Sequence, residues 1–508
     1  MSDERKTRPE APGLEKAPTG ISGFDTLSYG GLPAGRTTLV AGSSGSGKTV
    51  FAAQFLACGI LDHGEPGVFV TFEESPADIR ANVAGFGWDI AAWESEGLWA
   101  FVDASPDPEI EVLESGDYDL GGLLARIGGA VAKVGARRLS IDSLGAIFSQ
   151  FQDAAIVRKE LFRMAHAARG LGVTAVMTAE RIEEYGAIAR HGVEEFLSDN
   201  VVVLRNVLED EQRRRTIEIL KFRGTDHQKG EYPFAIVDER GLAVITLTGI
   251  ALQQQSTNVR VTSGSDELDE MCGGGFFRDS VILVSGATGT GKTLSVTHFV
   301  DGGARDGDRC LLLGYEESRE QLFRNATGWG SDFAALEQAG KLKVVCEYPE
   351  MRGLEDHLLR VKRMIDEFRP QRVAVDSLSA LERMGSPKAF RQFVIGLTSF
   401  IKDESITGLI TNTTPTLIGG TSVTEAHISS LTDSIILLRY VEMFGEMRRG
   451  IMVLKMRGSQ HDKEIREVTI DSSGLHVGAA FRTVSGILSG HPTQNHGLDR
   501  LETLFPEG

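Results

Sequence analysis

The sequence has few cysteines and no long apolar run, and both absences narrow what the protein can be. Only four cysteines occur in 508 residues, and their spacing fits neither a metal site nor a disulfide framework. No run of about 18 apolar residues is present to span a bilayer, and the N-terminal segment lacks the apolar centre of a signal peptide. We therefore expect a soluble, cytoplasmic protein whose thiols are reduced. These thiols belong to Cys58, Cys272, Cys310 and Cys346.

Positive charge is also in short supply. The chain has 53 Lys and Arg against 71 Asp and Glu, which gives a formal net charge of −18. Such a chain repels the phosphate backbone of nucleic acids unless a local basic surface overrides the net charge, so we do not expect a nucleic-acid partner. Hydrophobic residues make up 41% and charged residues 24%, which is typical of a globular protein with two or three domains.

An internal repeat sets the domain count. GGLPAGRTTLVAGSSGSGKT (30–49) matches GGFFRDSVILVSGATGTGKT (274–293), and three further motif pairs follow in the same order. The interval from Asp142 to Lys221 is 79 residues, as is the interval from Asp376 to Lys455. Short Val/Ile/Leu-rich runs alternate with helical stretches, which predicts an α/β fold with a mostly parallel sheet in each repeat. We predict an N-terminal tail (1–14), a first domain (15–247), a linker (248–257), a second domain (258–482) and a C-terminal tail (483–508).

Both repeats carry the phosphate-loop pattern G-x-x-x-x-G-K-T between a predicted strand and a predicted helix. Glycines let backbone N–H groups surround phosphate oxygens, the lysine reaches the terminal phosphates, and the threonine hydroxyl binds Mg²⁺. A glycine-rich turn without nucleotide is the alternative, but the full pattern occurs twice in register. The expected ATP contacts are Gly45, Ser46, Gly47, Lys48, Thr49 and Val50, then Thr288, Gly289, Thr290, Gly291, Lys292, Thr293 and Leu294.

Carboxylates follow other predicted strands of each repeat. Asp142 and Asp376 end apolar strands and suit the binding of Mg²⁺ beside the phosphate loop. The pairs Glu73-Glu74 and Glu316-Glu317 follow the next strand after each loop, and one member of each pair is expected to be the catalytic base. The alternatives are structural roles, in which the aspartates cap turns and the glutamates lie in solvated acidic turns. The expected metal ligands are Thr49, Asp142, Thr293, Glu316 and Asp376.

Two arginines are candidates for action on a neighbouring copy. Arg215 and Arg449 each lie six residues before a lysine, Lys221 or Lys455. This even separation predicts that both cations of each pair lie on one face of a strand. In a ring-forming ATPase such a face would reach the triphosphate of a neighbour in trans. Cross-strand ion pairing is the alternative.

Longer strings make the chain resemble the KaiC family from about residue 15 to 492. ILKFRGTDHQKGEYPF, YEESREQL, GEMRRGI and KMRGSQHDKEIRE are among them, and they are far more specific than phosphate loops. The resemblance implies two tandem RecA-like P-loop NTPase domains, a homohexamer, and ATP with Mg²⁺ between adjacent copies. It further implies slow ATP hydrolysis with Glu73 as base in the first domain and autophosphorylation with Glu316 as base in the second.

The resemblance also implies nucleotide contacts outside the phosphate loops. Trp329 matches a tryptophan beside adenine. The contacts expected in trans are Lys221, Phe222, Arg223, Thr225 and His227 in the first domain, and Lys455, Met456, Arg457, Ser459, His461 and Asp462 in the second.

The phosphoacceptors follow from the alignment of EEFLSDNVVVLR (194–205) with ISSLTDSIILLR (428–439). Ser429 and Ser430 offer hydroxyls where the first repeat has Glu195 and Phe196, so transfer to protein is expected in the second domain alone. KaiC proteins have Ser followed by Thr at this place, and Thr424 matches a nearby family threonine. A serine lacks the β-methyl that restricts χ1, so the order of phosphorylation is not inherited from the family.

Partners and rival functions complete the expectations. Residues 104–124 resemble the family segment near the KaiB-binding face, whereas the tail after residue 492 resembles no KaiA-binding tail. We therefore expect a KaiB-like partner and no KaiA-like one. The leading hypothesis is an ATPase and autokinase that signals through its phosphorylation state. The alternatives are a nucleic-acid-dependent RecA/DnaB-like ATPase and a nucleotide-gated scaffold.

Overall fold

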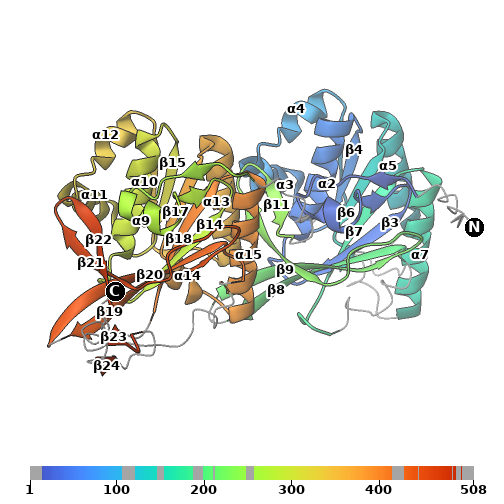
Figure 1. Ribbon diagram of the computed structural model, residues 1–508. Helices are drawn as coiled ribbons and strands as arrows, with labels where there is room; N and C mark the ends of the chain where they lie inside the picture. Colours follow the sequence, from blue (N-terminus) through green and yellow to red (C-terminus); the bar gives the residue numbers. More distant parts are fainter. Residues whose placement is uncertain are drawn as a thin grey trace, which may run out of the picture. The chain divides into compact units, whose positions relative to one another are not determined.

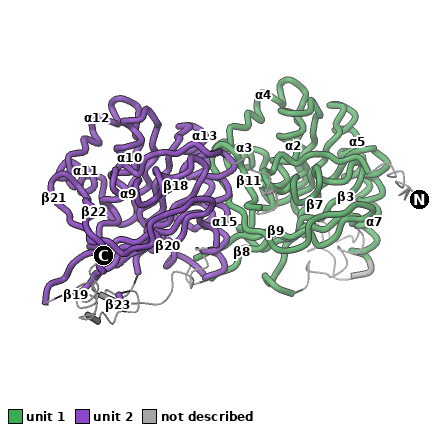
Figure 2. The backbone as a smooth tube through the Cα atoms, in the orientation of Figure 1, with its two compact units in different colours: residues 1–249 green, residues 250–508 purple. Residues whose placement is uncertain are grey.

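The computed structural model describes residues 14–105, 120–145, 154–186, 198–209, 212–246, 257–414, 428, 430–443, 445–482, 484–487 and 493–494. The chain divides into two compact units, residues 1–249 and 250–508 (Figure 2). Each unit is built on a nine-stranded, mostly parallel sheet flanked by helices, so the predicted fold class is confirmed. The predicted linker and tail boundaries stay predictions, because residues 247–256 and most of both tails lie outside the described residues.

The sheet of the first unit has the order β11-β10-β9-β8-β3-β7-β6-β4-β5 (Figure 1). Strands β3 to β8 pair in parallel, and β9, β10 and β11 continue the sheet in antiparallel pairs. The strands are β3 (Thr37–Gly42), β4 (Gly67–Thr71), β5 (Trp99–Asp103), β6 (Arg138–Asp142), β7 (Thr174–Glu180), β8 (Asn200–Glu209), β9 (Gln212–Phe222), β10 (Glu231–Val237) and β11 (Gly241–Val244), with the small pair β1 (Lys16–Ala17) and β2 (Leu32–Pro33). The helices are α1 (Phe24–Leu27), α2 (Lys48–His63), α3 (Pro76–Val83), η1 (Ala84–Phe86), α4 (Ile90–Ser95), α5 (Leu120–Val134) and α7 (Ala154–Gly170).

The sheet of the second unit has the matching order β16-β15-β17-β18-β14-β19-β20-β21-β22. Its strands are β14 (Val281–Gly286), β15 (Cys310–Gly314), β16 (Leu342–Cys346), β17 (Arg372–Asp376), β18 (Thr407–Thr413), β19 (Ser434–Met443), β20 (Glu446–Met456), β21 (Arg466–Asp471) and β22 (Gly474–Ala480), with the small strands β12 (Arg260–Val261), β13 (Phe276–Phe277), β23 (Val484–Ser485) and β24 (Thr493–Gln494). The helices are α9 (Asp266–Met271), α10 (Lys292–Arg305), α11 (Arg319–Gly328), α12 (Phe333–Gln338), η2 (Pro349–Met351), α13 (Leu354–Phe368), α14 (Leu378–Glu382) and α15 (Pro387–Asp403).

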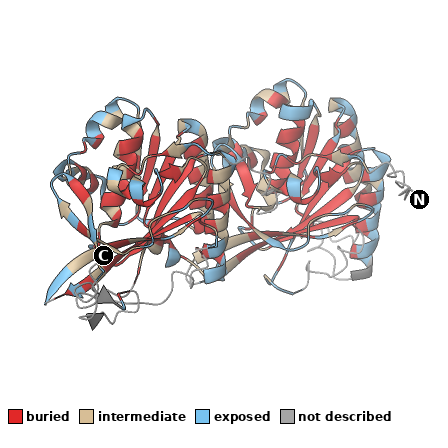
Figure 3. Ribbon diagram, in the orientation of Figure 1, coloured by how far each residue is buried: buried red, intermediate tan, exposed pale blue. Residues whose placement is uncertain are grey.

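Apolar side chains cover both faces of each sheet. In the first unit one cluster joins α2 to the face that carries Val202 and Ile217, and another joins α5 and α7 to the face that carries Val201 and Val203. The central strands are buried along their length, which is why they are continuous Val/Ile/Leu runs rather than alternating ones (Figure 3). Among the described residues, no helix is both long and apolar enough to cross a membrane.

A β-bulge overturns one prediction from the sequence. Val201 pairs with Lys221, but the next residue, Val202, pairs with Ile219, so Leu220 is an extra residue on β9. The bulge reverses the alternation of faces, and Arg215 and Lys221 therefore lie on opposite faces of the sheet despite their even separation. The second unit has the same bulge at Leu454, between the partners Ile435/Lys455 and Ile436/Val453. The predicted shared cationic face is thus wrong for both pairs.

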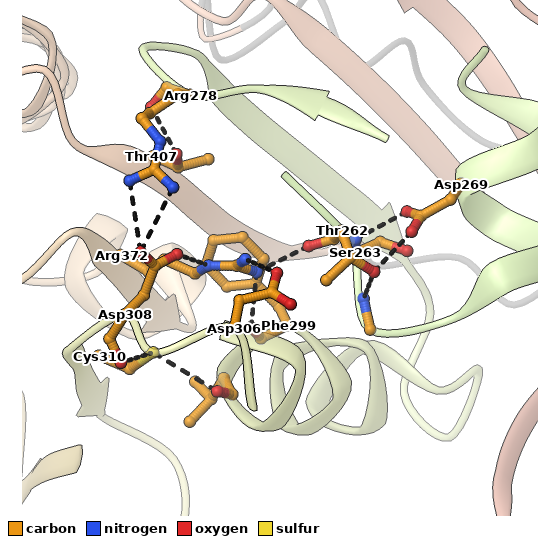
Figure 4. A network of polar contacts seen from close by, with 12 residues as sticks. Thr262, Ser263, Asp269, Arg278, Phe299, Asp306, Asp308, Cys310, Arg372 and Thr407 are labelled. Atoms are coloured by element: carbon orange, nitrogen blue, oxygen red, sulfur yellow. Dashed lines mark hydrogen bonds and ion pairs between the residues drawn. The ribbon is translucent and has the colours of Figure 1, made fainter. Parts of the chain in front are cut away.

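A buried arginine ties the leading segment of each unit to its phosphate-loop helix. Arg372 begins β17, is 1% exposed, and donates from Nε to Asp308 Oδ2 at 2.9 Å and from Nη2 to Asp306 Oδ2 at 3.2 Å (Figure 4). Its Nη1 donates to the carbonyls of Thr262 and Phe299 at 2.7 and 3.2 Å. The network therefore joins the segment before α9, the helix α10 and the start of β17.

The first unit has the same arrangement around Arg138, which begins β6. Its Nη1 donates to the carbonyls of Pro18 and Phe55 at 2.6 and 2.8 Å, and Nε donates to Glu65 Oε2 at 2.7 Å. Arg138 contacts one carboxylate, whereas Arg372 contacts two, and the Glu65 side chain is 37% exposed. The two units thus have an arginine at the same position of the fold, but the number of carboxylates around it differs.

Candidate active sites

Each phosphate loop connects a buried strand to a long helix. In the first unit the loop follows β3 and α2 begins at Lys48, with Gly45 and Gly47 at φ values of 70° and 95°. In the second unit Gly289 and Gly291 have φ values of 80° and 109° before α10. Side chains other than glycine rarely adopt this left-handed region, so the glycines allow the loop to turn its N–H groups inward. The helix N-terminus behind each loop favours an anion.

The two loop lysines lie over their own loops. Lys48 Nζ donates to the Ser43 carbonyl at 2.9 Å, and Lys292 Nζ donates to the Ala287 carbonyl at 3.0 Å. Burial lowers the pKa of both lysines, while nearby carboxylates, including Asp142 and Asp376, act in the opposite direction. Each ammonium group is therefore placed where a phosphate would supply compensating charge.

A hydroxyl, a carboxylate and a second hydroxyl form the same chain of hydrogen bonds in both units. Thr49 Oγ1 donates to Asp142 Oδ2 at 2.6 Å, and Thr293 Oγ1 donates to Asp376 Oδ2 at 2.7 Å. The other oxygen of each aspartate accepts from Thr178 or Thr411. Burial raises the pKa of Asp376, and the hydrogen bonds from the two threonines act against this effect.

These oxygen ligands fit Mg²⁺. Magnesium prefers hard oxygen ligands and is commonly bound through one or two protein groups together with substrate phosphates. No cluster of three or more His, Cys, Asp or Glu side chains that could hold a metal occurs in the described part of the chain. A magnesium ion at the Thr–Asp pair would take its remaining ligands from nucleotide phosphates and from water.

The paired glutamates have different surroundings. Glu73 Oε1 accepts from Ser143 Oγ at 2.9 Å, and Glu316 Oε1 accepts from Ser377 Oγ at 2.6 Å, so the first member of each pair lies next to the strand-end aspartate. The second member points elsewhere, because Glu74 Oε2 accepts from Asn82 at 2.8 Å. Asn325 holds Glu317 in the same way at 2.9 Å. Burial raises the pKa of Glu317, with a further contribution from the charge of Asp376.

The residues expected to act in trans lie at the opposite edge of the sheet, which here means the other ends of its strands from the phosphate loop. Thr38 and Gly42 of β3 pair with Asn200 and Leu204 of β8, and Asn200 pairs with Phe222 at the end of β9. Phe222 is thus level with the start of β3, whereas the phosphate loop follows its end. In the second unit Met456 pairs with Ser434, which is level with the start of β14. Six strand residues separate this level from that of Arg215, about 20 Å at about 3.3 Å per residue.

Local contacts hold the remaining members of this edge. Lys221 and Lys455 donate to the carbonyls of Ser198 and Thr432 at 2.9 and 2.7 Å. The others make the following contacts: Phe222 with the ring of His227, Arg223 with Asp199, Thr225 with the Asp226 carbonyl, Arg457 with Asp433, Ser459 with Arg260, and Asp462 with Arg466. His461 has a buried Nδ1 for which the structure gives no hydrogen-bond partner.

Arg215 and Arg449 lie instead against the phosphate loops of their own units. Arg215 Nε donates to the Gly45 carbonyl at 3.1 Å, and Arg449 Nε donates to the Gly289 carbonyl at 3.1 Å. Arg449 also lies 5.7 Å from the centroid of the Tyr440 ring. Both arginines therefore lie beside the phosphate loop of their own unit, and their expected action on a neighbour's nucleotide stays a prediction.

Two further predicted positions, Trp329 and Ser430, are described. Trp329 directly follows α11 and packs, half-buried, on the core of the second unit. Ser430 lies just before β19, and its carbonyl accepts from Arg457 at 3.0 Å. Ser430 therefore belongs to the same edge as Met456 and not to the edge of the phosphate loop. Ser429, Thr424, Glu195 and Phe196 lie outside the described residues.

Sequence reasoning missed the residues that hold the carboxylates predicted to be catalytic or to bind metal. These are Thr178 and Thr411 on the aspartates, Ser143 and Ser377 on the first glutamates, and Asn82 and Asn325 on the second glutamates. The repeat contains the signal, since each asparagine follows its glutamate by eight residues in both units. A residue-by-residue comparison of the repeats matches the members of each pair, but it does not show which groups they contact.

Comparison with known proteins agrees with this geometry. The profile of the KaiC ATPase family matches residues 17–249 and 261–481. The chain is 65% identical to circadian clock protein KaiC3 of Synechocystis, over 98% of this chain and 99% of the relative. It is 57% identical to the circadian clock oscillator protein KaiC of Thermostichus vulcanus, over 95% and 92% of the two chains. For KaiC of Synechococcus elongatus the identity is 56%, over 96% and 93%. With two phosphate-loop sites of matching geometry and this extent of identity, the chain belongs to the KaiC family of ATPases.

Proposed function

We propose that the protein hydrolyses ATP in its first unit and phosphorylates its own serines in its second, as a ring of identical subunits. The observation that carries the proposal is the separation of two half-sites within each unit. The phosphate loop, aspartate and glutamates lie at one edge of the sheet, and the residues from Lys221 to His227, or from Lys455 to Asp462, lie at the other. A second copy is therefore needed to bring both halves to one nucleotide.

In this proposal the two carboxylates of each site have separate roles. The aspartate and the loop threonine hold magnesium, which neutralises phosphate charge when bound, and the loop lysine contacts the terminal phosphates. Glu73 accepts a proton from the attacking water, and Glu316 accepts a proton from a serine hydroxyl. The serine oxygen forms a bond to the γ-phosphorus while the bond to the β-γ bridging oxygen breaks, so that ADP leaves.

The position of Ser430 argues for transfer between copies. Ser430 lies at the edge opposite the phosphate loop of its own unit, with its carbonyl held by Arg457. Its hydroxyl would thus accept phosphate from ATP bound to a neighbour. The proposal extends to both Ser429 and Ser430, to a homohexamer, and to a phosphorylation state that signals, and the names of the relatives as circadian clock proteins support a role in timekeeping. A KaiB-like partner for the first unit is part of the same proposal.

The test is incubation with γ-labelled ATP followed by mapping of the labelled peptides. The native chain is expected to carry label on Ser429, Ser430 or both, and Glu316→Gln is expected to lose label while ATP hydrolysis in the first unit continues. Glu73→Gln is the matched control, with hydrolysis reduced by about 10²-fold or more if it is the base. Label that persists in the double variant Ser429→Ala/Ser430→Ala would refute the acceptor assignment.

Mixing two inactive variants tests transfer between copies. Lys292→Ala removes the nucleotide contact from one edge, and Arg457→Ala removes the contact from the other. In a randomly mixed ring, about a quarter of the contacts between neighbours combine an intact loop with an intact opposite edge. We expect label to return to about a quarter of the native level. No recovery in stably mixed rings would contradict transfer between copies.

A further inference from the structure

Gln54 and His298 occupy the same place on the two phosphate-loop helices. Each lies six residues after the loop lysine, Gln54 on α2 and His298 on α10. Both side chains point at the turn between the last two strands of the sheet, β10–β11 in the first unit and β21–β22 in the second. A glycine at each turn makes room for them. A Cβ on Gly241 would lie 2.5 Å from Gln54 Oε1, and a Cβ on Gly474 would lie 2.1 Å from His298 Nε2.

These hairpins also contact the phosphate loops. A Cβ on Gly47 would lie 3.2 Å from Ile236 Cδ1, and a Cβ on Gly291 would lie 3.3 Å from Ile470 Cδ1 and 3.5 Å from Leu475 Cδ1. The last glycine of each loop therefore packs directly against its hairpin. Contacts that fix the hairpin therefore also restrain this glycine, whose left-handed backbone conformation shapes the loop.

The anchors differ in chemistry. Gln54 Oε1 accepts from the Leu242 N–H at 2.7 Å, and Gln54 Nε2 donates to the carbonyls of Arg240 and Leu242 at 3.1 and 3.3 Å. His298 Nε2 accepts from the N–H of Leu475, the counterpart of Leu242, at 3.4 Å. An amide accepts at every pH, but an imidazole accepts only while it is neutral, because both nitrogens become donors on protonation.

We infer that Gln54 and His298 are positioning residues that hold these hairpins against the phosphate loops, and that acid releases the hairpin of the second unit alone. The inference rests on the proposed nucleotide sites for its effect on activity, but the hairpin contacts do not depend on them. Protonated His298 would present an N–H to the N–H of Leu475. The nucleotide site of the second unit would then lose its support in acid, whereas the first unit would keep it.

The charged groups around His298 come from three elements. Asp301 and Arg305 share α10 with it and form an ion pair, Glu267 lies on α9, and His476 lies on β22. His476 is itself paired with Glu267 and with Asp471 of β21. Burial lowers the pKa of His298 below its usual value of 6.5, with smaller and opposing contributions from Asp301 and Arg305. A lowered pKa in the folded state means that the stabilisation is present above pH 6.5 and is lost as the pH falls.

Hydrogen exchange of the two hairpins tests the inference in the full-length protein. Peptides spanning 466–480 and 231–244 are compared from pH 7.5 to 5.5, with rates corrected for intrinsic exchange. We expect protection of the second hairpin to fall by up to about tenfold per pH unit once His298 titrates, while that of the first hairpin stays constant. His298→Gln is expected to abolish the fall, since Gln54 shows that glutamine serves at this place. Equal behaviour of both hairpins in the native chain would overturn the inference.

His476→Gln identifies the responsible histidine. If this variant removes the pH dependence and His298→Gln does not, the anchor is wrongly assigned. Phosphate incorporation is measured in parallel over the same pH range, and it should decline in acid less steeply for His298→Gln than for the native chain. A hairpin response without any labelled serine would support the anchor and refute the proposed kinase. Labelled serines with a pH-insensitive second hairpin would support the proposed kinase and refute the anchor.

Discussion

Replacement of Arg372 by methionine is expected to destabilise the second unit more than the same change at Arg138 destabilises the first. Methionine keeps much of the apolar volume but removes the guanidinium, so the buried partners lose their donors. For Arg372 these are Asp308, whose side chain is 9% exposed, and the carbonyls of Thr262 and Phe299, whereas the Asp306 side chain is 52% exposed and can turn toward water. Removal of one partner of a buried ion pair costs about 3–5 kcal/mol. Because Arg278 still contacts Asp308, we expect the lower end, about 3 kcal/mol.

Arg138 supplies the matched control. The carboxylate that it pairs with among the described residues, Glu65, is 37% exposed and can turn toward water once the arginine is gone. The remaining cost comes mainly from two carbonyls left without this donor, about 1–3 kcal/mol. Urea unfolding followed by hydrogen exchange reports the free energy of unfolding of each unit separately, with nucleotide concentration held fixed. The reasoning is refuted if Arg372→Met destabilises its unit by no more than Arg138→Met destabilises the other.

Three further predictions concern the active sites and the bulge. Thr411→Val removes a donor to Asp376 and should weaken magnesium affinity by about tenfold or more in a metal titration, with Thr398→Val, whose hydroxyl donates within α15 to the Val394 carbonyl, as control. Since burial raises the pKa of Asp376, its ionisation disfavours the folded state as the pH rises through the interval between the unfolded and folded pKa values. Asp376→Asn should therefore stabilise the nucleotide-free second unit at pH 7.5 while it abolishes phosphorylation, and a lower free energy of unfolding would contradict this. Deletion of Leu454 should leave phosphorylation intact, because Val453 and Lys455 already pair with the consecutive residues Ile436 and Ile435 and so keep their faces, and a loss of label would contradict this. Leu454→Ala, at a residue 42% exposed, should change stability by about 0.5 kcal/mol or less in urea unfolding.

The repeat and the phosphate-loop motifs allowed the fold class and the strand-end aspartates to be placed from sequence. Buried parallel strands appear as continuous apolar runs, and their carboxyl ends share one edge, so motifs at those ends must come together. The faces of β9 and β20 could not be placed in this way. Strand periodicity assumes regular pairing, and nothing in ILKF or VLKM marks Leu220 or Leu454 as the extra residue.

The supporting side chains escaped prediction for a different reason. Threonine, serine and asparagine are common and serve many purposes, and only the three-dimensional structure shows that Thr178 and Thr411 donate to the aspartates. The surroundings of Glu73 and Glu74 likewise depend on Ser143 and Asn82, which come from other parts of the fold. Sequence identified the pair, and the fold distinguishes its members.

The opposed edges of each sheet restrict the symmetry of any assembly that completes the sites. In a two-fold dimer residue i contacts residue j while j contacts i, so a dimer could complete two sites only where both edges belong to one self-complementary patch. Where the two edges belong to separate patches, a loop edge that meets an opposite edge forms a heterologous, head-to-tail contact. Such contacts either close into a ring or continue as a filament, depending on the rotation between neighbours. A substitution that changed this rotation by a few degrees could convert a closed ring into an open fibre while every individual site stayed intact.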